Sequence, residues 1–313
     1  MMKQTYKNFY ELTTSIQAAS AKTIVVAAAE DMASLSAVSE ACGKFPLKYI
    51  FVGDRDKIKH VSDELGFAVD ESRIISASSF GDAAARAVSV IRDLPKGTGI
   101  LMKGKVDTPT FLSCVLDKEN GIRSRDALAR STDQDDTRTM SHIAMLHVPG
   151  YHKLITITDG GMCAHPTFKQ KVDIIHNVTD FLNGLGIVPK IAVLSASEAI
   201  NPKIQESVDA YELAKLCQSG GLGDCIVEGP LSFDLAANKK AAEVKGIESQ
   251  ISGDVDVLLA PSVTAGNCLA KGLIAWGGAT MAGAVLGAQV PIVLVSRGAS
   301  AEEKLLSIAI CAR

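Results

Sequence analysis

The 313-residue sequence has few aromatic residues, no run of basic residues and no paired cysteine motif. Its 32 Lys and Arg nearly balance its 35 Asp and Glu, for a net charge of -3. Binding along a nucleic-acid backbone needs clustered cations, so we expect no nucleic-acid partner. The cysteines number seven, an odd count, and no CxxC pair occurs. This pattern argues against a disulfide framework and a structural zinc site.

Long hydrophobic runs are also missing. The nearest candidate, 279–295, contains Thr280, Gln289 and Pro291, and it is shorter than the roughly 20 apolar residues of a spanning helix. The opening MMKQTYKNFYELTTS is polar and has no apolar signal-peptide core. These features predict a soluble, cytoplasmic protein with no membrane partner.

Aliphatic residues are plentiful, and the hydrophobic share of 47% rests on Ala, Val, Leu and Ile. Such a composition is typical of sheets covered by helices. Strand patterns alternate with helical patterns at short spacing up to about residue 116, and the alternation restarts after 152. This pattern predicts βαβ units in an α/β fold of two lobes, with a boundary at the turn 149–152.

Two local predictions concern single segments. The stretch 118–139 is charged and lacks apolar periodicity, so it predicts a long surface loop or flap. Residues 232–244 predict one helix between two strands. Ligands of such folds bind at the carboxyl ends of the strands, and the chain should place its binding residues there.

The segment GILMKGK, 99–105, has the glycine and lysine spacing of a phosphate-binding loop. Val106 follows where a Mg²⁺-binding hydroxyl should stand, so nucleotide hydrolysis is rejected. Lys103 and Lys105 could still meet an anion, or they could be solvated loop lysines. GGLGD, 220–224, follows a helix and lacks the third glycine of a dinucleotide site, so it predicts a helix end and a turn.

No HExxH or GxSxG motif occurs, so neither a metalloprotease site nor a serine-hydrolase triad is signalled. Each cysteine taken alone is more typical of a small buried side chain than of a nucleophile. Gly266, Asn267 and Lys271 stand near the start of a predicted helix after the strand VDVLLAPS. Backbone amides there could bind phosphate, although an ordinary helix start explains them as well.

The strongest anion-binding pattern is 291–303, a strand, a tight turn and a new helix opening at Ser300. Arg297 supplies a planar cation suited to phosphate or carboxylate, beside the hydroxyl of Ser296. Glu303 adds a carboxylate in the first turn of the helix. The alternative is structural, because Ser300 and Glu303 fit the S-x-x-E pattern of a capping box.

Several separated blocks resemble the phosphate acetyl/butyryltransferases, and they are more similar to the butyryltransferases than to the acetyltransferases. These blocks are MKGKVDTPTFL, SHIAMLHVPGYHKLITITDGG, QKVDII, KIAVLSASEAINPKIQESVDA, EGPLSFDLA, PSVTAGNCLAKGL and VLVSRGASAEE. They cover the chain from about residue 98 to its end, in the expected order.

The resemblance implies a fold of the isocitrate/isopropylmalate-dehydrogenase type, with the active site in an interdomain cleft. The first lobe would be 1–150 plus 286–313, and the second would be 151–285. It also implies the reaction acyl-CoA + phosphate ⇌ acyl phosphate + CoA on a short-chain acyl group such as butyryl. Coenzyme A and phosphate would be substrates, with no prosthetic group, no metal and no covalent acyl-enzyme. The expected assembly is a homodimer or a larger homo-oligomer.

Carried onto this sequence, the resemblance gives Ser296 a hydrogen bond to the CoA sulfur and gives Arg297 the phosphate. Glu303 stands where the acetyltransferases have an aspartate that accepts the thiol proton. Ser113 replaces a phosphate-contacting arginine, and Arg123 or Arg138 could substitute for it. The residues expected to bind CoA or phosphate are Lys103, Gly104, Thr108, Arg123, Gly266, Asn267 and Lys271.

Two other functions stay open on the sequence. One is a non-catalytic CoA- or phospho-ligand-binding homologue, since the arginine expected at Ser113 is missing. The other is a metal-dependent dehydrogenase on the same fold, although no clear set of metal-binding aspartates or nicotinamide site is visible.

Overall fold

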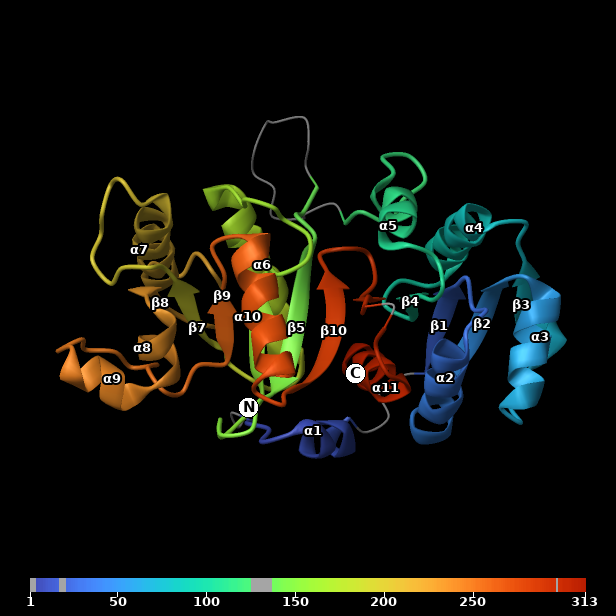
Figure 1. Ribbon diagram of the computed structural model, residues 1–313. Coiled ribbons are helices and arrows are strands. Elements are labelled where there is room, and N and C mark those ends of the chain that lie inside the picture. Colours follow the sequence, from blue (N-terminus) through green and yellow to red (C-terminus); the bar gives the residue numbers. More distant parts are fainter. Residues whose placement is uncertain (1–3, 17–20, 125–136, 297) are drawn as a thin grey trace. The chain divides into compact units, whose positions relative to one another are not determined.

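A computed structural model describes residues 4–16, 21–124, 137–296 and 298–313 of the chain (Figure 1). The chain forms two compact units. We call Leu12–Arg138 with Ala282–Arg313 the Ser296 unit, and Met1–Glu11 with Thr139–Met281 the central unit. The short helix α1 (Phe9–Ser15) begins in one unit and ends in the other.

The Ser296 unit contains a sheet with the strand order β3-β2-β1-β4-β11-β10. The pairs from β3 to β11 are parallel, and β10 and β11 form an antiparallel pair with Ala284 opposite Val293. The apolar run 279–295 is therefore a β-hairpin. The strands are β1 (Lys22–Ala27), β2 (Leu47–Gly53), β3 (Ile74–Ser76), β4 (Gly99–Lys103), β10 (Thr280–Leu286) and β11 (Ile292–Val293).

Helices cover both faces of this sheet (Figure 1). One face carries α2 (Met32–Lys44), α3 (Arg55–Glu64) and α11 (Ala301–Cys311), while α4 (Phe80–Asp93) and α5 (Thr108–Leu116) pack together on the other. A short 3₁₀ turn, η1 (Glu71–Arg73), precedes β3. All five α-helices begin at a Ser or Asp whose side chain accepts a backbone N–H, which is the usual way to satisfy a helix start.

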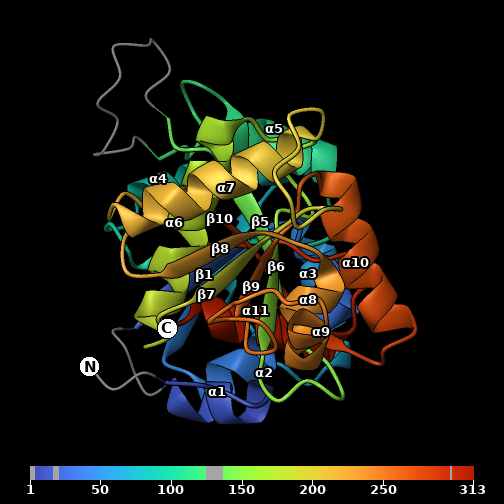
Figure 2. The ribbon, with the colours of Figure 1, turned by 90° about the vertical axis from the view of Figure 1, so that its left-hand side faces the viewer.

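In the central unit the strands lie in the order β5-β6-β9-β7-β8; β5 and β6 pair antiparallel, and the pairs from β6 to β8 are parallel. Its strands are β5 (Ser141–His147), β6 (Ile155–Thr158), β7 (Lys190–Leu194), β8 (Ile226–Leu231) and β9 (Val257–Leu259). Helices α6 (Phe168–Gly184) and α7 (Gln205–Gln218) lie on one face, and α8 (Phe233–Ala237), α9 (Lys239–Val244) and α10 (Val263–Ala275) on the other (Figure 2). The expected α/β fold is confirmed, with a mixed sheet covered by helices.

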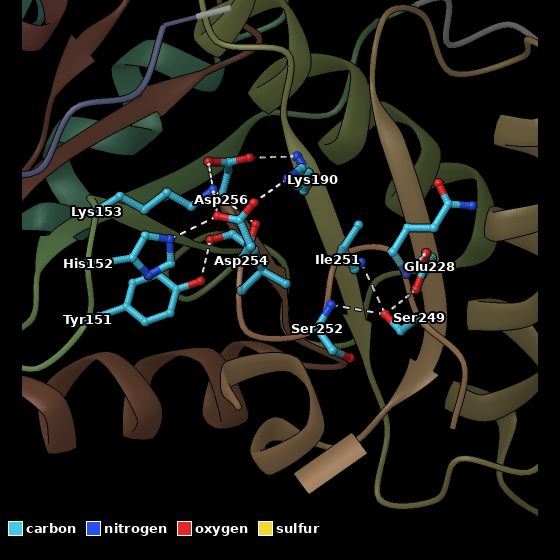
Figure 3. A network of polar contacts seen from close by, with 12 residues as sticks. Tyr151, His152, Lys153, Lys190, Glu228, Ser249, Ile251, Ser252, Asp254 and Asp256 are labelled. Atoms are coloured by element: carbon cyan, nitrogen blue, oxygen red, sulfur yellow. Dashed lines mark hydrogen bonds and ion pairs between the residues drawn. The ribbon is translucent and has the colours of Figure 1, made fainter. Parts of the chain in front are cut away.

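A polar network joins the amino ends of β6, β7 and β9 in the central unit (Figure 3). The buried Lys153 ammonium lies 2.9 Å from Asp254 Oδ1 and 2.6 Å from Asp256 Oδ1. Asp254 also accepts hydrogen bonds from Lys190 and His152. The Tyr151 hydroxyl donates to the Val255 carbonyl at 2.8 Å, so the turn before β6 is tied to the strand beside it.

Three sequence predictions differ from the structure or fall outside it. The turn 149–152, expected as a lobe boundary, connects the paired strands β5 and β6, and the compact units divide at 138/139 instead. The single helix expected over 232–244 is wrong, because the Asn238 side chain accepts the N–H groups of Lys240 and Ala241 and starts a new helix. Most of the expected long loop, 125–136, lies outside the described residues.

Candidate functional site

A small pocket of about 110 Å³ lies at the carboxyl ends of β4 and β11 in the Ser296 unit. Parallel strands bring their carboxyl ends to one edge of a sheet, so residues distant in sequence meet there. Three lysines and one aspartate stand around the serine. The lining residues are Asp31, Lys103, Gly104, Lys105, Val295, Ser296 and Lys304.

Gly104 allows the chain after β4 to approach the backbone after β1. Its N–H donates to the Ala27 carbonyl at 2.9 Å, and the next N–H, of Lys105, donates to the Ala28 carbonyl at 2.8 Å. A Cβ at position 104 would lie 2.3 Å from the Ala28 oxygen. Glycine is therefore required for backbone packing, and this packing brings Lys103 and Lys105 to the segment that leads to Asp31.

Asp31 and Lys304 form an ion pair at the wall of the pocket. Asp31 begins α2 by accepting the Ser34 N–H, and its Oδ1 also accepts the Lys304 ammonium at 3.0 Å. Lys304 donates a second hydrogen bond to Ser34 Oγ at 3.1 Å. Burial on its own would raise the pKa of Asp31, but the hydrogen bonds from Ser34 and Lys304 outweigh it and lower that pKa. Asp31 is therefore a carboxylate at neutral pH.

The three residues expected to be catalytic, Ser296, Arg297 and Glu303, differ in their surroundings and in whether the structure describes them. Ser296 is exposed at the pocket, and its Oγ accepts the Gly298 N–H at 3.4 Å. Arg297 lies outside the described residues. Glu303 is part of a capping box: its Oε2 accepts the Ser300 N–H at 2.9 Å and its own N–H donates to Ser300 Oγ at 3.1 Å. The structural alternative for this pair is confirmed.

Two of the seven expected binding residues, Lys103 and Gly104, meet Ser296 at the pocket. Lys103 is 3% exposed, and its ammonium donates to the carbonyls of Gly104 and Val106. Thr108 is the first residue of α5, after the cap Asp107, and it is not part of the pocket lining.

Arg123 does not reach the pocket beside Ser296. It pairs with Ala288 ahead of β11, and it lines a separate hollow of about 1000 Å³ with Arg92 and Gln289. That hollow is at the amino ends of β4 and β11, opposite the Ser296 end. Arg123 also donates a hydrogen bond to Thr137. The arginine missing at Ser113 is therefore not replaced by Arg123 at this pocket.

The expected binding residues of the central unit lie on α10. Gly266 packs on the turn after β6, where a Cβ would be 2.6 Å from the Asp159 carbonyl oxygen. The Asn267 amide donates to the Gly160 carbonyl at 3.1 Å, and Lys271 is exposed. Gly266 and Asn267 thus hold the turn 159–161 against the helix. The sequence predicted a phosphate site at Gly266 and Asn267. The contacts of these two residues in the structure are packing contacts with the turn after β6.

The thiol of Cys163 lies near the carboxylate of Asp159 in the central unit. Burial raises the pKa of Cys163 to about 12, with a further contribution from Asp159, so this thiol is protonated near neutral pH. The lining of the Ser296 pocket contains no cysteine. Within the described ranges, no group of three or more His, Cys, Asp or Glu side chains could hold a metal ion, and no helix could span a membrane.

Sequence reasoning missed Asp31 and Lys304 and left Lys105 undecided. Asp31 had a signal: it stands four residues after Ala27, the carboxyl end of β1, where ligands bind in such sheets. Lys304 had no sequence signal, because a lysine in the first turn of a helix usually faces solvent. Only the packing of α11 against α2 brings its ammonium to Asp31.

The mixed sheet covered by helices makes the chain an α/β protein, and its Ser296 pocket lies at the carboxyl ends of β4 and β11, lined by three lysines and Asp31. More particularly, the chain belongs to the phosphate acetyl/butaryl transferase family, whose model matches residues 8–312. The resemblance stated from the sequence is confirmed.

Named relatives cover nearly the whole chain. Phosphate butyryltransferase of Clostridium acetobutylicum is 34% identical over 98% of this chain and 97% of its own length. Phosphate acetyltransferase of Thermotoga maritima is 33% identical over 97% of this chain and 99% of its own. The crystal structure of a branched-chain phosphotransacylase from Enterococcus faecalis superposes with a TM-score of 0.74 at 31% identity, covering 93% of this chain and 97% of that one.

Proposed function

We propose that this protein transfers a short-chain acyl group, butyryl or similar, between coenzyme A and inorganic phosphate: acyl-CoA + phosphate ⇌ acyl phosphate + CoA. The observation that carries the proposal is the position of Ser296 beside a lysine-lined pocket, in a chain that belongs to a family of phosphate acyltransferases. Coenzyme A and phosphate are substrates in this scheme, and no prosthetic group is needed. The fold of isocitrate/isopropylmalate-dehydrogenase type, the interdomain site and the homodimer or larger assembly stay predictions.

The chemistry fits these residue types. Phosphate is a poor nucleophile that must be held against the thioester carbonyl, and positioned cations and hydrogen-bond donors do this. The leaving thiolate needs little help, because an alkyl thiol has a pKa of about 8.5 if judged from cysteine. We assign Ser296 to the CoA sulfur and Arg297 to the phosphate.

The reverse direction needs a base, because the CoA thiol must lose a proton before it attacks the acyl phosphate. Glu303 is proposed for this step. Its Oε2 is engaged by the Ser300 N–H in the capping box, which leaves Oε1 as the oxygen available to the thiol. The helix cap thus orients the carboxylate and does not preclude its use as a base.

The test is phosphate-dependent release of free thiol from butyryl-CoA, followed with a thiol reagent. We expect release with phosphate, little without it, and formation of butyryl phosphate in equal amount. Arg297→Ala is expected to lose turnover while keeping its unfolding temperature. Thiol release that is equal with and without phosphate would disprove the proposal, as would no release from acetyl-, butyryl- and branched-chain acyl-CoA. Ranking kcat/KM over these three substrates measures the acyl preference.

A further inference from the structure

Lys304 is a buried cation that uses two of its three hydrogen-bond donors on residues that the structure describes. Its side chain lies in the first turn of α11 and lines the pocket beside Ser296, although the residue is only 5% exposed. An ammonium group carries three N–H donors. Asp31 Oδ1 accepts one and Ser34 Oγ accepts a second, at 3.0 and 3.1 Å. These two contacts fix the ammonium and leave the third donor for a ligand.

The pocket contains more positive than negative charge. Lys103, Lys105 and Lys304 line it against the single carboxylate of Asp31. Lys103 is as deeply buried as Lys304, and its ammonium donates to the carbonyls of Gly104 and Val106. Opposite charges attract, so a multiply charged oxyanion is favoured in a pocket lined by three lysines.

Asp31 has a second oxygen suited to the same ligand. Oδ2 is buried and has no hydrogen-bond donor among the residues that the structure describes. A buried carboxylate oxygen in this state favours a ligand that can donate. Monohydrogen phosphate does so, because it carries one hydroxyl together with its charged oxygens. The pocket thus matches both the charge and the hydrogen-bonding pattern of phosphate.

Neither Ser113 nor Arg123 supplies a cation at this pocket. Ser113 is exposed and its hydroxyl donates to the Thr110 carbonyl, while Arg123 lies at the other end of the strands. We propose that Lys304 is the second cation of the phosphate site and contacts the phosphate oxyanion beside Ser296. Asp31 holds Lys304 in place with Oδ1 and offers Oδ2 to the phosphate hydroxyl. The inference rests on the proposed function, since it names the phosphate site of that reaction.

Phosphate groups occur in two of the substrates, so the test must separate inorganic phosphate from the phosphates of CoA. Lys304→Gln removes the charge and keeps much of the side-chain length. We expect it to raise KM for phosphate by about 10-fold or more, because a lost hydrogen bond to a charged group commonly has an effect of this size. KM for butyryl-CoA should change less than about twofold.

The matched control is Lys171→Gln. Lys171 is an equally buried lysine, paired with Asp209 at 2.6 Å in the central unit and absent from the lining of the pocket. Its loss should lower stability without changing KM for phosphate. An unchanged phosphate KM in Lys304→Gln would refute the proposal. A rise confined to butyryl-CoA would also refute it, because it would assign the cation to a CoA phosphate.

Asp31→Asn provides a second variant if Lys304→Gln does not fold. Asparagine caps a helix as well as aspartate does, so α2 should begin normally while the ion pair is lost. We expect a higher KM for phosphate and an unchanged KM for butyryl-CoA. Asp54→Asn, which alters the cap of α3, is the control and should change neither. Equal kinetics of Asp31→Asn and Asp54→Asn would contradict the role of Asp31 in the phosphate site.

Calorimetric titration with inorganic phosphate alone separates this inference from the proposed function. Wild-type protein should bind phosphate, and Lys304→Gln should bind it about 10-fold more weakly or worse. This result can be obtained whether or not thiol release is seen. Absence of turnover with phosphate binding that depends on Lys304 would reject the reaction and keep the site. Turnover with equal phosphate binding by both proteins would reject the site.

Discussion

At position 104 the backbone leaves room for a hydrogen only. We expect Gly104→Ala to lower the free energy of unfolding by about 1–3 kcal/mol, because the added Cβ meets the Ala28 carbonyl oxygen at 2.3 Å. Gly43→Ala is the matched control. Nothing lies within 4 Å of its added Cβ, and alanine favours a helix, so it should raise stability by about 0.4–1 kcal/mol. Urea denaturation measures both, and equal effects would contradict the packing argument.

The contacts of Glu303 could be predicted from the sequence, whereas those of Lys304 could not. The S-x-x-E pattern is local, and both of its hydrogen bonds are present. The partners of Lys304 lie more than 260 residues earlier in the chain. No local spacing reveals such a contact, because it depends on which helices pack together.

At the scale of elements, side-chain caps explain most helix starts. Ser300 was identified from sequence because its partner is three residues away. Asn238 was missed because the helical pattern continues on both sides of it, and only the backbone at that residue shows the break. The antiparallel pairing of β5 and β6 was missed because the sequence shows that a segment is a strand but not which strand it pairs with.

The polar network in Figure 3 should make stability depend on acid pH. Burial opposes the charge of Asp254, but hydrogen bonds from Lys190, Lys153 and His152 outweigh it and lower the Asp254 pKa well below its usual range. A lowered carboxyl pKa stabilises the fold above the unfolded value of about 3.9, and this contribution is lost as pH falls below it.

We therefore expect Asp254→Asn to be less stable than wild type at pH 6, with the gap closing as the pH falls below about 3.9. Urea unfolding over this pH range measures it. Asp63→Asn, an exposed position on α3, is the control and should follow the wild-type curve. A gap that stays constant or widens in acid would show that Asp254 does not stabilise through its charge.

At the scale of the whole molecule, burial sets the reactivity of the thiols. It raises the pKa of Cys42 to about 11 and the pKa values of Cys163, Cys225 and Cys311 to about 12, while Cys268 is exposed. The thiolate is the reactive form, so iodoacetamide at pH 7.5 should modify Cys268 well before these four. Peptide mass spectrometry follows the sites. Modification of Cys163 or Cys311 as fast as Cys268 would contradict the expectation.

The sequence by itself determined the α/β class, most element positions, the capping box at Ser300 and membership of the phosphate acyltransferases. These follow from periodicity, local spacing and blocks of residues in a fixed order. The tertiary structure decided which charges surround Ser296. Parallel strands and packed helices bring Asp31, Lys103, Lys105 and Lys304 together and take Arg123 away. Such a pocket is made by contacts between distant segments, and those contacts exist only once the chain has folded.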